Sequence, residues 1–216
     1  VIAGSIAEDL LLKRNIKIIS KIKSIGQVND VDLNYEDLNN DEFYNLKSSY
    51  FPVFDKFSKE EMQKEILSAK EKSDSIGGII ETAILNMPIG IGEPFFDSME
   101  SVISHAIFSV PGVKGIEFGS GFEAAKMFGS YHNDSYYYDN GKVKTKTNNH
   151  GGIIGGLSTS MPIIFRTAIK PTSSIGKAQE TISIKNKKVE NLKINGRHDP
   201  SIVPRAVVAL ETMTAI

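Results

Sequence analysis

Three polar segments in the second half of the sequence contain residue types that can bind anions or move protons. They are the stretches 148–156 (NNHGGIIGG), 170–174 (KPTSS) and 196–200 (GRHDP). Hydroxyls, a lysine, an arginine and closely spaced glycines suit an anionic ligand, because they donate hydrogen bonds, carry positive charge or expose backbone N–H groups. The combination predicts an anion- or cofactor-binding site, and its proton-transferring residues favour an enzyme.

The first stretch contains two glycine pairs, the second of which begins at Gly155. Glycine tolerates positive φ and lets backbone N–H groups approach a phosphate or a heterocycle closely. Paired glycines also mark bulges in twisted sheets, and the spacing alone does not separate these two interpretations. The spacing matches neither the dinucleotide-binding fingerprint nor the phosphate-binding P-loop.

The second stretch combines one cation (Lys170), a proline that fixes a turn (Pro171) and three hydroxyls (Thr172, Ser173 and Ser174). This compact set of donors suits a phosphate group. The same residue types also favour an ordinary turn at the end of a strand. Taken alone, the segment is better explained as such a turn.

The third stretch places Arg197, His198 and Asp199 between a predicted strand and the last predicted helix. Arginine can bind a phosphate or carboxylate with two hydrogen bonds, and Asp199 or His198 could transfer a proton. A structural interpretation has Asp199 capping the helix, with Pro200 at its first position. Asp199 could cap the helix and also transfer a proton, so both interpretations stand.

Composition narrows the possible classes of function. The absence of cysteine excludes disulfides, thiolate zinc sites and thiol catalysis. No metal site is expected, because the four histidines have no partner or carboxylate at ligand spacing. A net charge of −1 without a long basic run argues against nucleic acid and membranes as partners. With no secretory leader and no apolar stretch of the roughly 20 residues that span a bilayer, we expect a soluble, cytoplasmic protein.

The predicted strands come in runs joined by turns rather than in regular strand–helix alternation. Apolar runs predict strands at 15–25, 77–87, 113–118 and 163–170, and 139–141 (DNG) predicts a hairpin turn. This order predicts an α+β fold of antiparallel sheets with helices packed against them. The repeated Gly-Gly-Ile-Ile at 77–80 and 151–154 suggests an internally duplicated unit. No sharp linker divides the chain, so we expect one domain over residues 1–216.

Local signals make four further predictions. Ser58 and Glu61 have the spacing of a capping box for a helix over 58–72, with Phe57 and Met62 as its hydrophobic staple. The acidic, asparagine-rich segment 30–44 is expected to be a surface excursion or a short exposed helix. The last residues, 204–216, predict a helix. Because the sequence begins and ends within helical patterns, we expect the native protein to continue in both directions.

The same three polar stretches, in this order, resemble those of the chorismate synthase family. Further similarity runs through nearly the whole chain. It includes 1–7 (VIAGSIA), 74–78 (DSIGG), 88–94 (PIGIGEP), 113–119 (VKGIEFG) and the segment from Gly129-Ser130 to Asn133-Asp134. The ordered succession of these motifs identifies the chain as resembling a large part of a chorismate synthase.

The resemblance implies helices sandwiched between antiparallel sheets and a homotetrameric lyase of the shikimate pathway, which supplies aromatic amino acids. It implies a 1,4-anti elimination of phosphate from 5-enolpyruvylshikimate 3-phosphate, giving chorismate. Reduced FMN is required without net redox change, since it can lend an electron to the allylic system. The sequence leaves open whether the protein reduces its own flavin with NADPH.

The resemblance also assigns residues. The segment Lys170 to Ser174 would bind FMN, as would Arg197 and the backbone at Gly155 and at Pro111-Gly112. Asp199 would take part in proton transfer near the flavin. The family's two catalytic histidines and most of its substrate-binding arginines belong to an N-terminal part that this sequence lacks.

Three local departures from the family pattern concern the expected flavin contacts. His150 stands where alanine or serine is common, Ser160-Met161 replaces a common glycine-glutamine pair, and Pro111-Gly112 stands where other small or polar residues are usual. The alternative to the enzyme is a non-catalytic flavin- or anion-binding or oligomerisation fragment, inactive without the missing segment.

Overall fold

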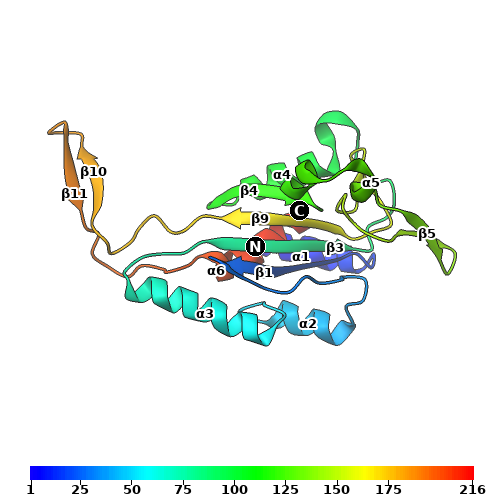
Figure 1. Cartoon of the computed structure of the whole chain (residues 1–216), viewed down its shortest axis with the longest axis horizontal. Coiled ribbons are helices and arrows are strands. Elements are labelled where there is room, and N and C mark those ends of the chain that lie inside the picture. The colour runs from blue at the N-terminus through cyan, green and yellow to red at the C-terminus, as the bar shows by residue number, and fades with distance from the viewer.

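A five-stranded antiparallel sheet runs through the centre of the computed structural model, which describes residues 1–216 (Figure 1). Its strand order is β2-β1-β3-β9-β4. The strands are β1 (Lys17–Ile25), β2 (Val28–Asn29), β3 (Gly78–Leu85), β4 (Val113–Phe118) and β9 (Ile163–Ile169). Every neighbouring pair is antiparallel, so the α+β class and the antiparallel pairing predicted from the sequence are confirmed.

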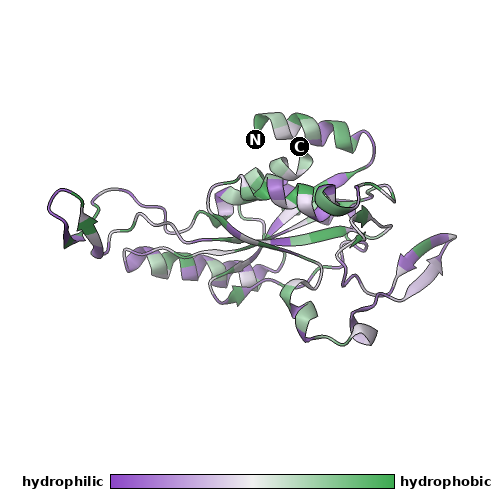
Figure 2. Cartoon of the chain, turned by 90° about the horizontal axis from the view of Figure 1, so that it is seen from above, coloured by the Kyte–Doolittle hydropathy of each residue, from purple (hydrophilic) through white to green (hydrophobic).

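Helices pack on both sides of this sheet. They are α1 (Ile2–Leu12), α2 (Asn40–Ser48), α3 (Lys56–Glu71), α4 (Met99–Phe108) and α6 (Val203–Ala215). Helices α6 and α4 cover one face, and α1 packs on the outside of α6. Helix α2 lies on the opposite face, and α3 runs along the β1–β2 edge (Figures 1 and 2).

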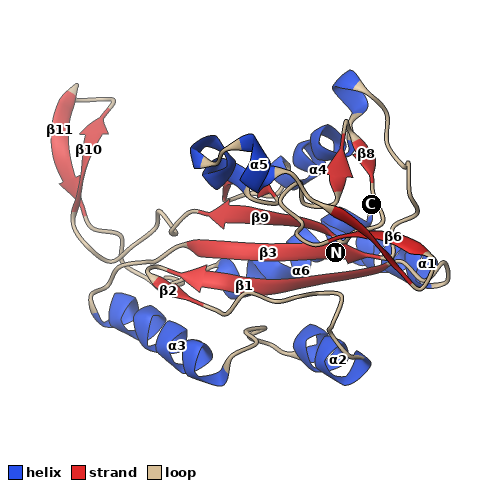
Figure 3. Cartoon of the chain, turned by 45° about the vertical axis from the view of Figure 1, so that its right-hand side comes forward, coloured by secondary structure: helices blue, strands red, loops and turns tan.

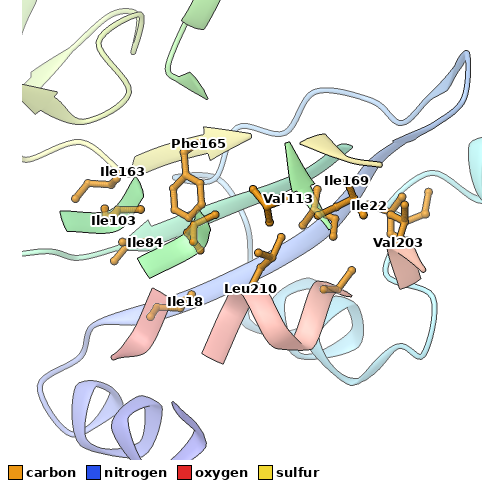
Figure 4. Close-up of a cluster of buried hydrophobic side chains, with 14 of the residues drawn as sticks. Ile18, Ile22, Ile84, Ile103, Val113, Ile163, Phe165, Ile169, Val203 and Leu210 are labelled. Carbon is orange, nitrogen blue, oxygen red and sulfur yellow. The ribbon is translucent and has the colours of Figure 1, made fainter. Parts of the chain in front are cut away.

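The isoleucine-rich sequence of β1 is explained by burial of both of its faces. Ile18 and Ile22 point toward Leu210 of α6 in the main hydrophobic core (Figure 4). The alternate residue Ile19 packs instead against Tyr35 and Phe43 in a second, smaller core. Because successive side chains of a strand point to opposite faces, a strand buried on both faces must be apolar at nearly every position.

The prediction that segment 30–44 is a surface excursion or a short exposed helix is confirmed in its main point, because most of its residues are exposed and the short helix α2 begins at Asn40. Some of its side chains are nevertheless buried. Tyr35 and Phe43 are buried, and they cover the α2 face of the sheet. Helix α2 is closed at its N-terminus by Asn39 and Glu42, whose side chains each accept a hydrogen bond from the other's backbone N–H. The acidic and asparagine residues of this segment thus flank a few buried side chains. The high average polarity of the segment gave no sign of these buried positions.

The capping box predicted at Ser58 was wrong. Helix α3 begins at Lys56, and the side chain of Asp55 caps it by accepting a hydrogen bond from the Ser58 N–H at 2.7 Å. Ser58 is buried within the first turn, and Phe57 is exposed and forms no staple. Both Asp55 and Ser58 are good N-cap residues, so the local pattern left two possible registers. The predicted burial of Met62 is confirmed.

Three hairpins and three short helical turns complete the fold. They are β5 (Tyr136–Asp139) with β6 (Lys142–Thr145), β7 (Ile153–Ile154) with β8 (Leu157–Ser158), β10 (Gln179–Ser183) with β11 (Lys188–Leu192), η1 (Phe95–Asp97), η2 (Gly121–Lys126) and α5 (Gly129–His132). The hairpin turn predicted at Asn140-Gly141 is confirmed, and both residues have positive φ. No helix of the chain is long and apolar enough to span a membrane.

The two Gly-Gly-Ile-Ile segments adopt different conformations. Gly77 and Gly78 lead into the central strand β3 and do not have positive φ. Gly151 and Gly152 both have positive φ and form a turn before the β7–β8 hairpin. The internal duplication that this repeat suggested stays a prediction.

Candidate functional site

Two of the predicted binding segments meet at one end of the sheet. Lys170 follows β9, and Pro111-Gly112 precede β4, the antiparallel neighbour of β9. The end of one strand therefore lies beside the start of the other. The Lys170 N–H donates a hydrogen bond to the Gly112 carbonyl at 2.9 Å. Gly112 has φ of +97°, a conformation that favours glycine.

The loop between α3 and β3 joins the third segment to this end. The Ser75 hydroxyl donates to the Thr172 carbonyl at 2.6 Å, and the Ile76 N–H donates to the Pro200 carbonyl at 2.8 Å. One short loop thus fixes two segments that lie almost thirty positions apart in the sequence. Ser75 and Ile76 were not among the site residues predicted from the sequence, although both lie in a segment that resembles the family.

Ser174 and His198 form a direct contact between the two segments. Their Oγ and Nδ1 atoms are 3.1 Å apart, and His198 Nε2 lies 3.1 Å from the Ile194 carbonyl oxygen. A carbonyl oxygen can only accept, so Nε2 carries the hydrogen of the neutral ring. Nδ1 is then the acceptor, and the Ser174 hydroxyl donates to it. This geometry fixes the histidine tautomer and links segment 170–174 to the loop that carries Arg197.

Positive charge without carboxylate partners accumulates around these loops. Lys170, Lys193 and Arg197 take part in no ion pair. A cleft of about 360 Å³ opens here, lined in part by Lys70, Lys193 and Arg197, and also by Asp74, which pairs with Lys177. Thr172 does not line this cleft, but its Oγ1 atom is buried and has no hydrogen-bond partner. Buried hydroxyls are normally satisfied, so an orphaned one in a segment that also carries Lys170 fits an anionic ligand.

Asp199 does not cap the last helix as predicted. Helix α6 begins at Val203, and it is Pro204 that occupies its first turn. The Asp199 carboxylate instead pairs with Arg205 of that helix at 2.5 Å. The cap prediction failed because Asp199 lies too far before the first helical residue to reach its N–H groups. The ion pair with Arg205 fixes the carboxylate at the edge of the loop that carries Arg197.

Gly155 lies at the other end of the sheet from Lys170. The Ile164 N–H at the start of β9 donates to the Gly151 carbonyl, which places the glycine-rich loop there. Lys170 lies seven positions after Ile163 along the extended chain, or about 23 Å at about 3.3 Å per residue. Figure 3 shows β8 and the β10–β11 hairpin at opposite ends of the molecule. Within one chain, Gly155 is therefore separated from the lysine and arginine segments.

The glycine-rich loop is organised by one buried carboxylate, Asp134. Its oxygens accept four hydrogen bonds, from Thr147 Oγ1 (2.6 Å), the Asn149 N–H (2.8 Å), and the N–H and Nδ1 of His150 (3.0 and 2.7 Å). Burial by itself raises the pKa of Asp134, but the hydrogen bonds from Thr147, His150 and Asn149 outweigh burial and lower it. Asp134 was not predicted as a site residue, because its partners are 13 to 16 positions away along the chain.

Comparison with known proteins identifies the family of this chain. A model of the family described as "Chorismate synthase" matches residues 1–216. The chain belongs to the chorismate synthase family. The chorismate synthase of Methanococcus aeolicus is 45 % identical over 100 % of this chain and 60 % of its own length. That of Korarchaeum cryptofilum is 44 % identical over 99 % of this chain and 58 % of its own length.

A solved structure described as "Crystal Structure of Chorismate Synthase" has the same fold. It superposes with a TM-score of 0.78 at 29 % identity, covering 99 % of this chain and 58 % of that one. The resemblance stated from the sequence motifs is thereby confirmed, and the protein belongs to an enzyme family. The chain spans about 60 % of the length of the curated relatives that it matches.

Proposed function

We propose that this chain is the larger part of a chorismate synthase, a lyase that eliminates phosphate from 5-enolpyruvylshikimate 3-phosphate to give chorismate. The observation that carries the proposal is the meeting of Lys170–Ser174 with Arg197–Asp199 around an unpaired positive cluster and an orphaned Thr172 hydroxyl. A cluster of donors without acceptors suits the phosphate groups of both a flavin mononucleotide and the substrate.

FMN fits the residues present at this end of the sheet. Lys170, Arg197 and the Thr172 hydroxyl would hold its phosphate or ring edge, and the backbone at Pro111-Gly112 would line the same loop. When bound in its reduced form, FMN supplies an electron-rich ring that eases departure of an allylic phosphate. Asp199 is the residue we assign to proton transfer, and Arg205 keeps its carboxylate in place.

The remaining features of the proposal follow from the family. We propose a cytoplasmic homotetramer that requires reduced FMN, with NADPH as reductant only if the protein reduces its own flavin. Gly155 lies too far from Lys170 to contact the same flavin within one chain. Its assigned backbone contact therefore requires a second copy or a change of conformation.

A second candidate is a fragment that binds FMN or another anion without catalysing the reaction. The observation that favours it is the separation of Gly155 from Lys170, which leaves the predicted site divided. The two candidates differ in one measurement. FMN binding by this chain without chorismate formation by the full-length protein would favour the second candidate.

The test is FMN binding measured by quenching of flavin fluorescence, on this chain and on the full-length protein. Lys170→Ala/Arg197→Ala should weaken binding by about 100-fold, because two hydrogen bonds to charged groups are worth about 3 kcal/mol together. The matched control is Lys13→Ala/Arg14→Ala, which removes two exposed cations at the end of α1. Equal binding by the two double variants would refute the assigned site.

A single substitution tests the orphaned hydroxyl. Thr172→Val has nearly the same shape, and it removes a buried hydroxyl that has no partner in the free protein. Stability should therefore be unchanged or slightly higher, whereas FMN binding should weaken by about tenfold, the value of one hydrogen bond. Unchanged binding would show that Thr172 does not face the ligand.

A further inference from the structure

The hairpin β10–β11 stands apart from the rest of the molecule as an arm that projects from one end (Figure 1). Its base is fixed, because Lys177 pairs with Asp74 at 2.6 Å and the Gly176 N–H donates to the Ser73 carbonyl at 3.0 Å. Its strands pair only with each other. The arm is therefore held in a defined place by the body while its outer part has no contact with the sheet.

The outer part of the arm exposes apolar side chains on one face. Ile182 and Val189 are directly opposite each other across the two strands, and Ile184 follows in the turn. Each of the three is at least 69 % exposed. A two-stranded hairpin is at best marginally stable by itself in water, and exposed isoleucine and valine do not help it. Such an arm gains stability when another surface covers this face.

The arm is also basic. Residues 177–193 contain five lysines and two glutamates, a net charge of +3. Three of the lysines, Lys185, Lys187 and Lys188, lie at the tip beside Ile184. None of these three takes part in an ion pair with the body. The surface that covers the arm should therefore combine apolar side chains with negative charge.

The chain itself carries an acidic surface with exposed apolar side chains, in a segment that lies away from the arm. Segment 31–46 contains five carboxylates and no lysine or arginine. Asp32 and Glu36 pair with Lys23 and Lys144 from outside the segment, and the other three carboxylates take part in no ion pair. Asp37 and Asp41 are exposed there. The apolar Val31 and Tyr44, at 45 % and 53 % exposed, lie in the same segment. In Figure 1 the arm projects at the upper left and helix α2 lies below the sheet toward the lower right, so one chain does not bring them into contact.

We propose that the tip of the β10–β11 arm docks on segment 31–46 of a second copy of this chain. Each copy carries both surfaces. In a dimer with a two-fold axis the contact therefore forms twice, because the arm of each copy docks on the acidic segment of the other. The net charge of −1 adds little repulsion between copies. This inference names the contact surface for the self-association proposed above, and it does not depend on the flavin site.

Charge reversal in the full-length protein tests the contact by sedimentation velocity. The tip variant Lys185→Glu/Lys187→Glu should raise the dissociation constant of one association step at least tenfold. The acidic-segment variant Asp37→Lys/Asp41→Lys should do the same. An equimolar mixture of the two variants should recover association, because a mixed pair restores opposite charges at both contacts.

The control is Lys56→Glu/Lys72→Glu, which reverses two exposed lysines, one at the first residue of α3 and one just after its end, that take part in no ion pair. The proposal is overturned if the tip variant associates like the wild type, if the control weakens association equally, or if the mixture stays as weak as its components. It is also overturned if the tip substitutions abolish binding to phosphatidylserine vesicles and leave association unchanged. FMN binding by the same variants should remain, which separates failure of this contact from failure of the flavin site.

Discussion

Replacing Asp134 with asparagine tests whether one carboxylate organises the glycine-rich loop. Asparagine keeps one acceptor oxygen, which can serve Thr147 and the Asn149 N–H. Its amide nitrogen then faces two donors on His150, the backbone N–H and Nδ1. The imidazole can change tautomer and accept from the new amide, but the backbone N–H of His150 is left without a partner.

The expected loss of stability follows from the number of hydrogen bonds that the substitution removes. A hydrogen bond to a charged group contributes about 1.5–3 kcal/mol, and two such bonds are lost while one neutral bond is regained. The free energy of unfolding should therefore fall by about 2–4 kcal/mol at pH 7. The measurement is urea denaturation followed by far-UV circular dichroism. The matched control is Asp9→Asn, because Asp9 is exposed and should change stability by less than about 0.5 kcal/mol.

The pH dependence gives a second, independent check on Asp134. Its pKa is lower in the folded protein than its ordinary value. The stability that it contributes is therefore present above the unfolded pKa of about 3.9 and is lost as pH falls through the lower, folded pKa. The difference in the free energy of unfolding between wild type and Asp134→Asn should narrow below about pH 4. A difference under about 1 kcal/mol at pH 7, or one that does not narrow on acidification, would refute the reasoning.

Two further predictions concern buried contacts. Gly4→Ala should lower the free energy of unfolding by about 1–3 kcal/mol, because a Cβ there would overlap the Thr212 backbone carbonyl where α1 packs on α6. In a thermal melt the exposed control Ser5→Ala should stay near wild type, and equal melting of both variants would argue against close α1–α6 packing. Tyr35→Phe should cost about 1–3 kcal/mol, because the buried Glu81 loses the hydroxyl that donates to it at 2.9 Å. Burial, and then the charge of Glu81, raise the pKa of Tyr35 well above its ordinary value. Its contribution is therefore complete below about pH 10 and is lost only as pH rises through the folded pKa, so denaturation at pH 7 and 9 should give the same difference.

The sequence by itself determined the elements whose signals are local. The apolar runs gave β1, β3, β4 and β9 to within two residues at each end, because strand burial fixes residue type position by position. The Asn140-Gly141 turn was equally clear, since it needs two residues with positive φ. The ordered motifs also identified the family, and two of the three chemical stretches, 170–174 and 196–200, contain the cations and hydroxyls that the structure joins.

Only the tertiary structure decided which of these groups meet. The segments that carry Lys170 and Arg197 are joined through Ser75 and Ile76, whereas Gly155 lies at the far end of β9. Local signals also gave wrong partners, as with Asp199, which pairs with Arg205 instead of capping a helix. The physical reason is that a hydrogen bond or ion pair depends on distances of a few ångströms between residues far apart in the chain. Sheet order and loop packing set those distances, and no residue pattern within one segment records them.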